Sequence, residues 1–233
     1  MCEYTGVRFA TFRQTWTIDR LVLARLGPSA GMFPLTLHAE AHGVRFGVQV
    51  NNPVIQFMTH AMARPFSVYL DYARAPDGVL RAQASFSSAT AGNVSLAAVI
   101  AGVPDQLGNA PEPPASLRLR SFRLHMDGRG FFEAYLLPAL AGSLLGGSHD
   151  PAAAFATDKA RAIAAVTATL EGRAASPASL VALTSAIASL PNPDKPFDLW
   201  IEPPQPLSFD TMTDPARLRD ALPPGSVSAS YSN

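Results

Sequence analysis

The chain of 233 residues carries 18 Lys and Arg residues against 18 Asp and Glu residues, so its formal net charge is zero. Only 15% of the residues are charged, which excludes the basic surface that a nucleic-acid-binding protein or a polybasic membrane-surface protein needs. The hydrophobic fraction of 48% is sufficient for a large buried core and excludes a disordered chain.

Apolar and polar residues alternate through most of the first half, which predicts strands. A turn at His42-Gly43 is expected to join two of these strands into a hairpin over residues 34–50. Asn52-Pro53 opens a short helix that Arg64-Pro65 closes, and Ala75-Pro76-Asp77-Gly78 is a turn sequence. The strands predicted in this half cover residues 4–12, 17–26, 34–41, 44–50, 66–72, 79–86 and 92–100.

The proline-rich stretch 108–114 is the best internal boundary, and the hydrophobic period changes beyond it. A strand is expected over 117–126, followed by a helix that Gly146-Gly147 ends. Three more helices should begin where a capping residue precedes proline, and two more strands are expected. These helix starts and strands lie at Asp150-Pro151, Ser176-Pro177, Asp214-Pro215, 197–202 and 227–231.

Two predicted strands lose their alternation midway. In the strand over 117–126, Leu119 and Phe122 fall on opposite faces of a regular strand, and Ile18 and Leu21 show the same change. A bulge restores the phase and bends the strand, although a strand buried on both faces is the alternative. We therefore predict an α+β protein: a curved, mainly antiparallel sheet with helices packed on one side.

A near-repeat suggests two duplicated halves. Residues 64–71 match residues 195–202 by chemical class at seven of eight positions, and His38 and His125 lie in similar upstream segments. The halves would be a β-rich part over 1–110 with one short helix, and a part over 115–233 holding a strand and a helical excursion. One continuous domain is the alternative.

A resemblance to known proteins enters through residues 117–222. This region combines a strand ending at Asp127-Gly128, alanine-rich helices, Pro196-Phe197 before a strand, Glu-Pro-Pro-x-Pro-Leu over 202–207 and Asp-Pro-Ala-x-Leu over 214–218. It resembles uncharacterised proteobacterial envelope proteins of unknown function, in the broad neighbourhood of the AsmA-like and tubular lipid-binding folds. The resemblance implies a β-rich fold in the envelope, with a signal or anchor, and it implies no catalytic residues.

Metal and catalytic sites have little support in the sequence. His38, Glu40 and His42 share one face of a strand, but the opposite face is apolar, so solvent exposure explains them more simply than metal binding. Ser148, His149 and Asp150 are consecutive and cannot converge as a triad. Nucleophile-elbow, dinucleotide-binding, Walker and zinc-protease motifs are absent, so we expect no enzyme, metal or cofactor.

The remaining candidate site is apolar. Alanine-rich helices can leave room for a ligand between themselves and a sheet, although an ordinary helix-on-sheet core is the alternative. The residues expected to line such a cavity are Phe132, Leu136, Leu140, Phe155, Ile163 and Val166.

The sequence therefore predicts a non-enzymatic envelope protein that binds a lipid or amphiphile or supports an envelope assembly, with an envelope protein as a further partner. A protein-interaction scaffold is the first alternative and a hydrolase of unrecognised type is the second. The expected location is periplasmic or membrane-anchored, with the cytoplasm as the alternative. No stretch of about 20 mostly apolar residues is present, so we expect no transmembrane span.

Overall fold

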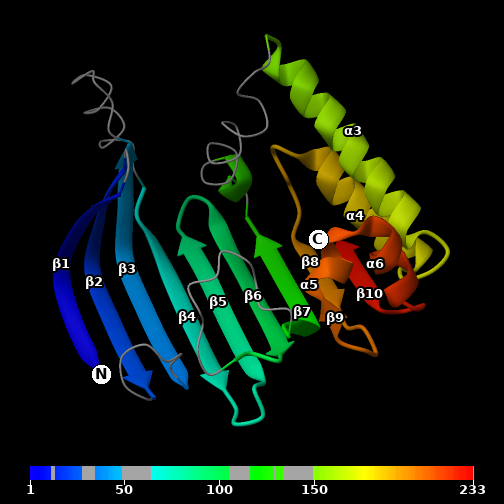
Figure 1. Cartoon of the computed structure of the whole chain (residues 1–233). Coiled ribbons are helices and arrows are strands. Elements are labelled where there is room, and N and C mark those ends of the chain that lie inside the picture. The colour runs from blue at the N-terminus through cyan, green and yellow to red at the C-terminus, as the bar shows by residue number, and fades with distance from the viewer. Residues whose placement is uncertain are drawn as a thin grey trace.

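The computed structural model describes residues 1–11, 14–27, 35–48, 64–104, 116–128, 130–133 and 149–232. These residues form an open antiparallel sheet of 10 strands with 4 helices packed beside it (Figure 1). The predicted α+β class, a curved and mainly antiparallel sheet with helices on one side, is confirmed.

The strands follow one another across the sheet in chain order from β1 to β8, then β10, while β9 pairs with β7. Their bounds are β1 Cys2–Thr11, β2 Gln14–Leu26, β3 Thr36–Val48, β4 Phe66–Arg74, β5 Leu80–Ser88, β6 Gly92–Ala101, β7 Arg118–Asp127, β8 Phe197–Ile201, β9 Leu207–Ser208 and β10 Val227–Tyr231. The helices are α3 Pro151–Leu170, α4 Pro177–Ser189, α5 Phe209–Thr213 and α6 Pro215–Ala221.

The helices start where the sequence predicted. Asp150 accepts a hydrogen bond from the N–H of Ala153 at 3.0 Å, and Ser176 accepts one from the N–H of Ser179 at 3.1 Å. Asp214 does the same for α6, and a proline follows each cap. The N–H groups of the first helical turn have no acceptor within the helix, and the side-chain oxygens of the capping residues accept their hydrogen bonds. Proline has no N–H group, so it fits at the first position of the helix.

The hairpin predicted over residues 34–50 is wrong, because β3 runs without a break from Thr36 to Val48. Gly43 has a φ of +63°, which a hairpin turn would also use, but here it serves a bulge inside one long strand. The register between β3 and β4 shifts between Ala41 and Val44.

Gly43 belongs to a row that crosses three strands. The pairs Thr5–Arg20 and Arg20–His42 place Gly6, Asp19 and Gly43 at neighbouring levels of β1, β2 and β3. Each of the three strands carries one extra residue at this level, so β1, β2 and β3 stay in register with one another. The register shifts only between β3 and β4. The phase change predicted in β2 is therefore present: Ile18 and Leu21 pack into the same cluster.

The phase change predicted in the strand over 117–126 is also confirmed. Val99 pairs with Ser121 whereas Ile100 pairs with Leu119, so Arg120 is the additional residue of a bulge in β7. β8 pairs with β7 on one side of this bulge, and the two-residue β9 pairs with β7 on the other side.

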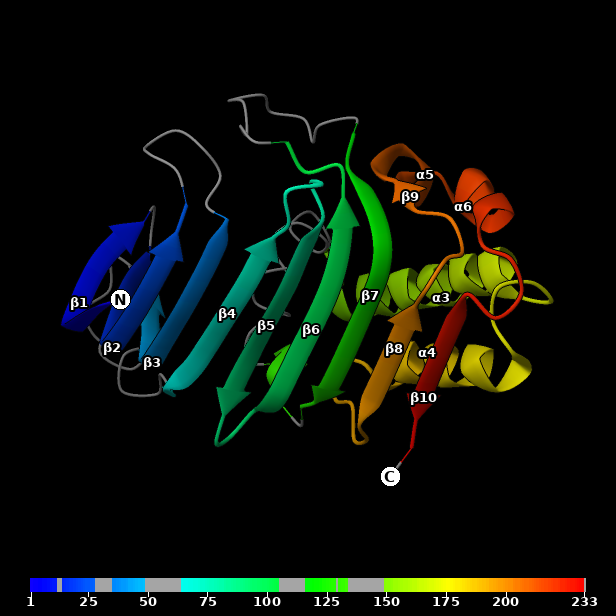
Figure 2. The ribbon, with the colours of Figure 1, turned by 90° about the horizontal axis from the view of Figure 1, so that it is seen from below.

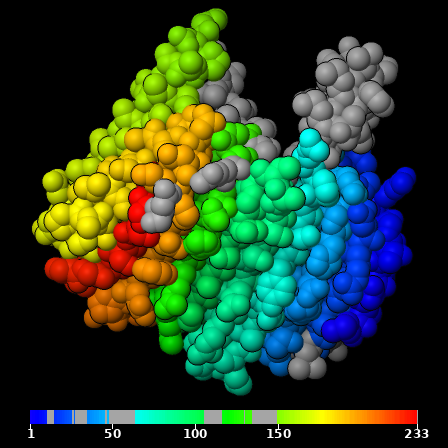
Figure 3. All heavy atoms as spheres, turned by 180° about the vertical axis from the view of Figure 1, so that it is seen from behind, coloured from blue at the N-terminus to red at the C-terminus, as the bar shows by residue number. Residues whose placement is uncertain are grey.

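One face of the sheet is apolar across nearly its whole width, because alternate residues of paired strands align. The helices cover the end of this face formed by β7 to β10, and Figure 2 shows α3 and α4 behind β8 and β10. Seen from behind, β4 to β7 form a broad surface beside the helices (Figure 3). One cross-strand apolar row consists of Tyr4, Leu21, Ala41, Val68, Phe86, Val94, Met126, Phe197 and Tyr231.

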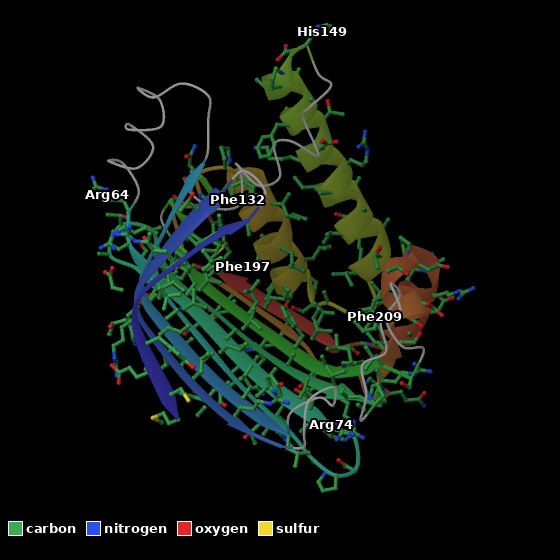
Figure 4. All side chains as sticks on the ribbon, turned by 60° about the vertical axis from the view of Figure 1, so that its left-hand side comes forward. Arg64, Arg74, Phe132, His149, Phe197 and Phe209 are labelled. Atoms are coloured by element: carbon green, nitrogen blue, oxygen red, sulfur yellow. The ribbon has the colours of Figure 1, made fainter. Side chains whose placement is uncertain are left out.

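Two clusters form the core among the described residues. The larger one packs the helices on the sheet around Leu170, Leu183 and Phe197, and Phe197 lies on the helix side of the sheet in Figure 4. The smaller one surrounds Ile18, Val44 and Phe66 in the part of the sheet near the bulge row.

The helix expected before Arg64-Pro65, the boundary at 108–114 and most of the helix expected before Gly146 lie outside the described residues. The sheet itself continues across the boundary, because β6 and β7 pair from Asn93–Asp127 to Ala101–Arg118. The two predicted parts, 1–110 and 115–233, therefore contribute strands to one sheet.

The near-repeat segments have the same direction and the same facing. β4 and β8 are separated by four antiparallel pairings, so they run in the same direction. Phe66 and Phe197 are both buried, and Tyr69 and Trp200 both lie on the opposite face, along one groove.

The register of the two repeat segments differs. His38 on β3 pairs with Asp71, and the residue that corresponds to Asp71 in the second segment is Glu202. The similarly placed His125 on β7 pairs instead with Asp198. This offset of four residues is even, so it preserves which side chains face the helices. An internal duplication therefore stays a hypothesis: the direction and facing of the two segments agree with it, and their register differs from it by four residues.

Candidate functional site

An apolar cavity of about 400 Å³ lies between the sheet and the helices. Its volume falls within the range of small-molecule sites, which is about 300–1,000 Å³. Strand residues form one side, with Leu199 and Ile201 of β8 at the centre, while Val166 of α3 and Leu218 of α6 belong to the helical side.

The cavity contains almost no groups that could hold water. Among its described lining residues, Thr169 alone has a polar side chain, and its hydroxyl donates to the carbonyl oxygen of Ala165 at 2.8 Å. A buried water needs two to four polar partners, so an apolar ligand fits this space better than water does.

Solvent reaches the cavity between α3 and α6. Ala165 and Pro215 both line it, and both are exposed, whereas Leu170, Leu207 and Val227, which also line it, are buried. The space is therefore a pocket with an entrance and an apolar end.

The six residues predicted to line a cavity have different positions. Val166 lines the observed cavity, and Ile163 is half-buried on the same helix outside the lining. Phe132, labelled in Figure 4, is buried and packs near Phe155 with ring centroids 6.4 Å apart. Neither ring lines the cavity. Leu136 and Leu140 lie outside the described residues.

Sequence reasoning missed the lining residues that come from strands and from the last helix. Leu199 and Ile201 occupy alternate positions of a predicted strand, and Leu218 and Leu222 have the spacing of one helix face. These signals were present, but only the pairing of β7 with β8 and β9 brings Leu119 and Leu207 beside them.

The three polar residues of β3 form a hydrogen-bonded group on the face away from the helices. Nε2 of His38 lies 3.1 Å from one oxygen of Glu40, and Nε2 of His42 lies 3.3 Å from the other. The hydrogen bond with His42 is the main cause that lowers the pKa of the Glu40 carboxyl below its ordinary value. No group of three metal-binding side chains forms in the part of the chain that the structure describes.

A second histidine–carboxylate pair joins β7 and β8. Nδ1 of His125 lies 2.7 Å from one oxygen of Asp198, and the hydroxyl of Ser230 donates to the other oxygen at 3.2 Å. Serine therefore contacts the carboxylate and not the imidazole, which differs from the order of a nucleophilic triad. His149 and Asp150 lie before α3, with Asp150 acting as its cap, and Ser148 is outside the described residues.

Comparison with protein-family models, curated proteins and solved structures finds no match for the chain. Within the residues that the structure describes, no helix combines the length and the apolar character that crossing a membrane requires.

Proposed function

We propose that this protein binds the apolar chain of a lipid or other amphiphile in the cavity between the sheet, α3 and α6. The observation that carries the proposal is an apolar cavity of about 400 Å³ with exposed residues at one end. Binding removes apolar ligand surface from water, which contributes roughly 0.8 kcal/mol for each buried methylene group.

The polar end of an amphiphile would stay at the entrance. Ala165 and Pro215 are exposed there, so a headgroup can remain hydrated while the chain enters toward Leu207 and Val227. Keeping a charged or polar headgroup in water avoids the desolvation cost that burial without partners would impose.

We place this binding activity in the bacterial envelope, with no catalytic step. The location rests on the sequence resemblance of residues 117–222, and the absence of chemistry rests on the lack of catalytic motifs in the sequence. An envelope protein partner is part of the same proposal.

The test compares two substitutions one helical turn apart on α3. Ala165 lines the cavity, whereas Ala162 is exposed and does not line it. We expect Ala165→Phe to weaken binding of a fluorescent fatty acid by about tenfold or more, and Ala162→Phe to leave it unchanged. Thermal unfolding of both variants, and mass spectrometry of lipid bound to the parent protein, complete the experiment.

Other outcomes would contradict the proposal. If the parent protein bound no fatty acid and carried no lipid, and Ala165→Phe lost about 1–3 kcal/mol of stability, the space would be a packed core. That result would favour the interaction scaffold. Equal loss of binding in both variants would place the ligand outside this cavity.

A further inference from the structure

A groove of about 370 Å³ lies on the face of the sheet opposite to the apolar cavity. It crosses β4 to β8, and most of its lining residues, among them Tyr69, Arg123 and Trp200, have side chains that point away from the helices. The groove shares no lining residue with the apolar cavity, so any ligand it binds is recognised independently of the proposed lipid site.

Aromatic side chains stand at both ends of this groove. Trp200 on β8 is 46% exposed although it is the largest side chain type, and Tyr69 stands on β4. The ring of Tyr69 is held by an edge-on contact with His38, at 5.3 Å between centroids, and by a 3.3 Å hydrogen bond from its hydroxyl to Asp71. The two rings occupy matching positions of the near-repeat segments.

Between the two rings, the groove is lined by polar side chains that make no hydrogen bond within the described part of the chain. Gln83, Ser95 and Arg123 are exposed and line it, and in the described part of the chain their side chains have no hydrogen-bond or ion-pair partner. Amide, hydroxyl and guanidinium groups together supply both donors and acceptors.

The charges of the groove are nearly balanced. Arg123 contributes one positive charge and Asp198 one negative charge, and Asp198 is already bound by His125 at 2.7 Å. A strongly anionic ligand would need a net positive site, and an apolar ligand would leave the polar groups without partners.

We propose that this groove binds a neutral oligosaccharide. A sugar ring has a C–H face that packs on an aromatic ring and hydroxyl groups at its edge that both donate and accept hydrogen bonds. Four strand spacings of about 4.8 Å separate β4 from β8, so roughly 19 Å lies between the two aromatic positions. That span suits several linked sugar units running across the strands, with Tyr69 and Trp200 under its two ends.

The experiment measures binding of maltohexaose, cellohexaose and chitohexaose to the whole chain by calorimetry, with an acidic oligogalacturonate as the comparison. Trp200→Ala should weaken binding of the preferred neutral sugar by about tenfold, because losing an aromatic stacking contact of roughly 1.4 kcal/mol lowers affinity by a factor of ten. The matched control is Phe209→Ala, because Phe209 is another exposed aromatic residue and lies on α5 outside the groove.

A second variant, Gln83→Ala, should weaken binding by a smaller factor, because it removes a hydrogen-bonding group and leaves both rings in place. Circular dichroism would verify that each variant is folded. The proposal would be overturned by no binding of any of the three neutral sugars, by equal loss in Trp200→Ala and Phe209→Ala, or by binding of oligogalacturonate alone. These results would leave fatty-acid binding at Ala165 unaffected, so the two proposals fail separately.

Discussion

The side chain of Asp19 on β2 occupies the space that a Cβ atom at Gly43 on β3 would need. A Cβ built at Gly43 would lie 2.6 Å from Cγ of Asp19, and Arg45 binds the same carboxylate at 2.8 Å. The bulge row across β1, β2 and β3 therefore depends on a residue without a side chain at this level of β3.

The first prediction compares the two glycines of this row. Gly43→Ala should lower the free energy of unfolding by more than Gly6→Ala, because both have a φ of +63° but only Gly43 has a neighbour within 4 Å of the new Cβ. The shared conformational cost is roughly 1–2 kcal/mol. Urea denaturation of both variants measures the difference, and equal losses would show that Asp19 moves freely.

The second prediction concerns Lys159, which connects two helices. Its Nζ donates to the carbonyl oxygens of Ala188 at 3.0 Å and Leu190 at 2.7 Å, at the end of α4. Lys159→Met should cost about 1 kcal/mol of stability, because these carbonyls would lose a charged donor.

The control for Lys159 is the other lysine of the chain, Lys195, which is exposed and lies 6.0 Å from the ring centroid of Tyr231. Lys195→Met should change stability by less than about 0.5 kcal/mol. Thermal unfolding of both variants compares them, and a larger loss in Lys195→Met would contradict the assignment.

The third prediction concerns acid stability. The pKa of Glu40 is lowered in the folded protein, chiefly by its hydrogen bond with His42, so the ionised carboxylate stabilises the fold. This stabilisation is fully present above the ordinary glutamate pKa of about 4.3 and is lost as the pH falls through the lower pKa of the folded state.

Glu40→Gln should therefore reduce stability at pH values above about 5, and the difference from the parent should shrink toward pH 3. Urea denaturation across this range measures it. A difference that grows on acidification would contradict the pairing of Glu40 with the two histidines.

The fourth prediction concerns metal. We expect no stoichiometric zinc binding at His38, Glu40 and His42, because each imidazole binds the carboxylate and zinc sites need further groups to orient their ligands. Calorimetric titration with zinc tests this. A one-to-one zinc signal that disappears in the His38→Ala, His42→Ala double variant would show that the prediction is wrong.

Local chemistry explains which features the sequence could predict. The caps Asp150 and Ser176 act within three residues, so the starts of α3 and α4 follow from short motifs. At Gly43 a short motif does not distinguish a turn from a bulge, because both can use a glycine with a positive φ. Only the long-range pairing of β3 with β2 and β4 selects the bulge.

The lining of the apolar cavity also contains residues that a short sequence pattern predicts and residues that only long-range packing brings together. Val166 was predicted because it belongs to the apolar stripe of one helix, which can be read within a few turns. Leu119, Leu199 and Leu218 come from three separated segments, so their convergence depends on strand pairing and helix packing. The groove on the other face has the same origin, since five strands contribute to it.

The direct pairing of β8 with β10 has a consequence for how this protein can diversify. Ile201 lies opposite Val227, and the N–H of Glu202 donates to the carbonyl of Ser226 at 2.8 Å, so the intervening chain begins and ends side by side. Between these ends it also contacts the sheet through β9, which pairs with β7. α5 and α6 lie within this excursion. Insertions, deletions or wholesale exchange of these two helices would alter the shape and entrance of the pocket while the ladder between β8 and β10 keeps its pairs. If the pocket binds apolar chains as proposed, variants with different segments between β8 and β10 would accept chains of different bulk on the same strands.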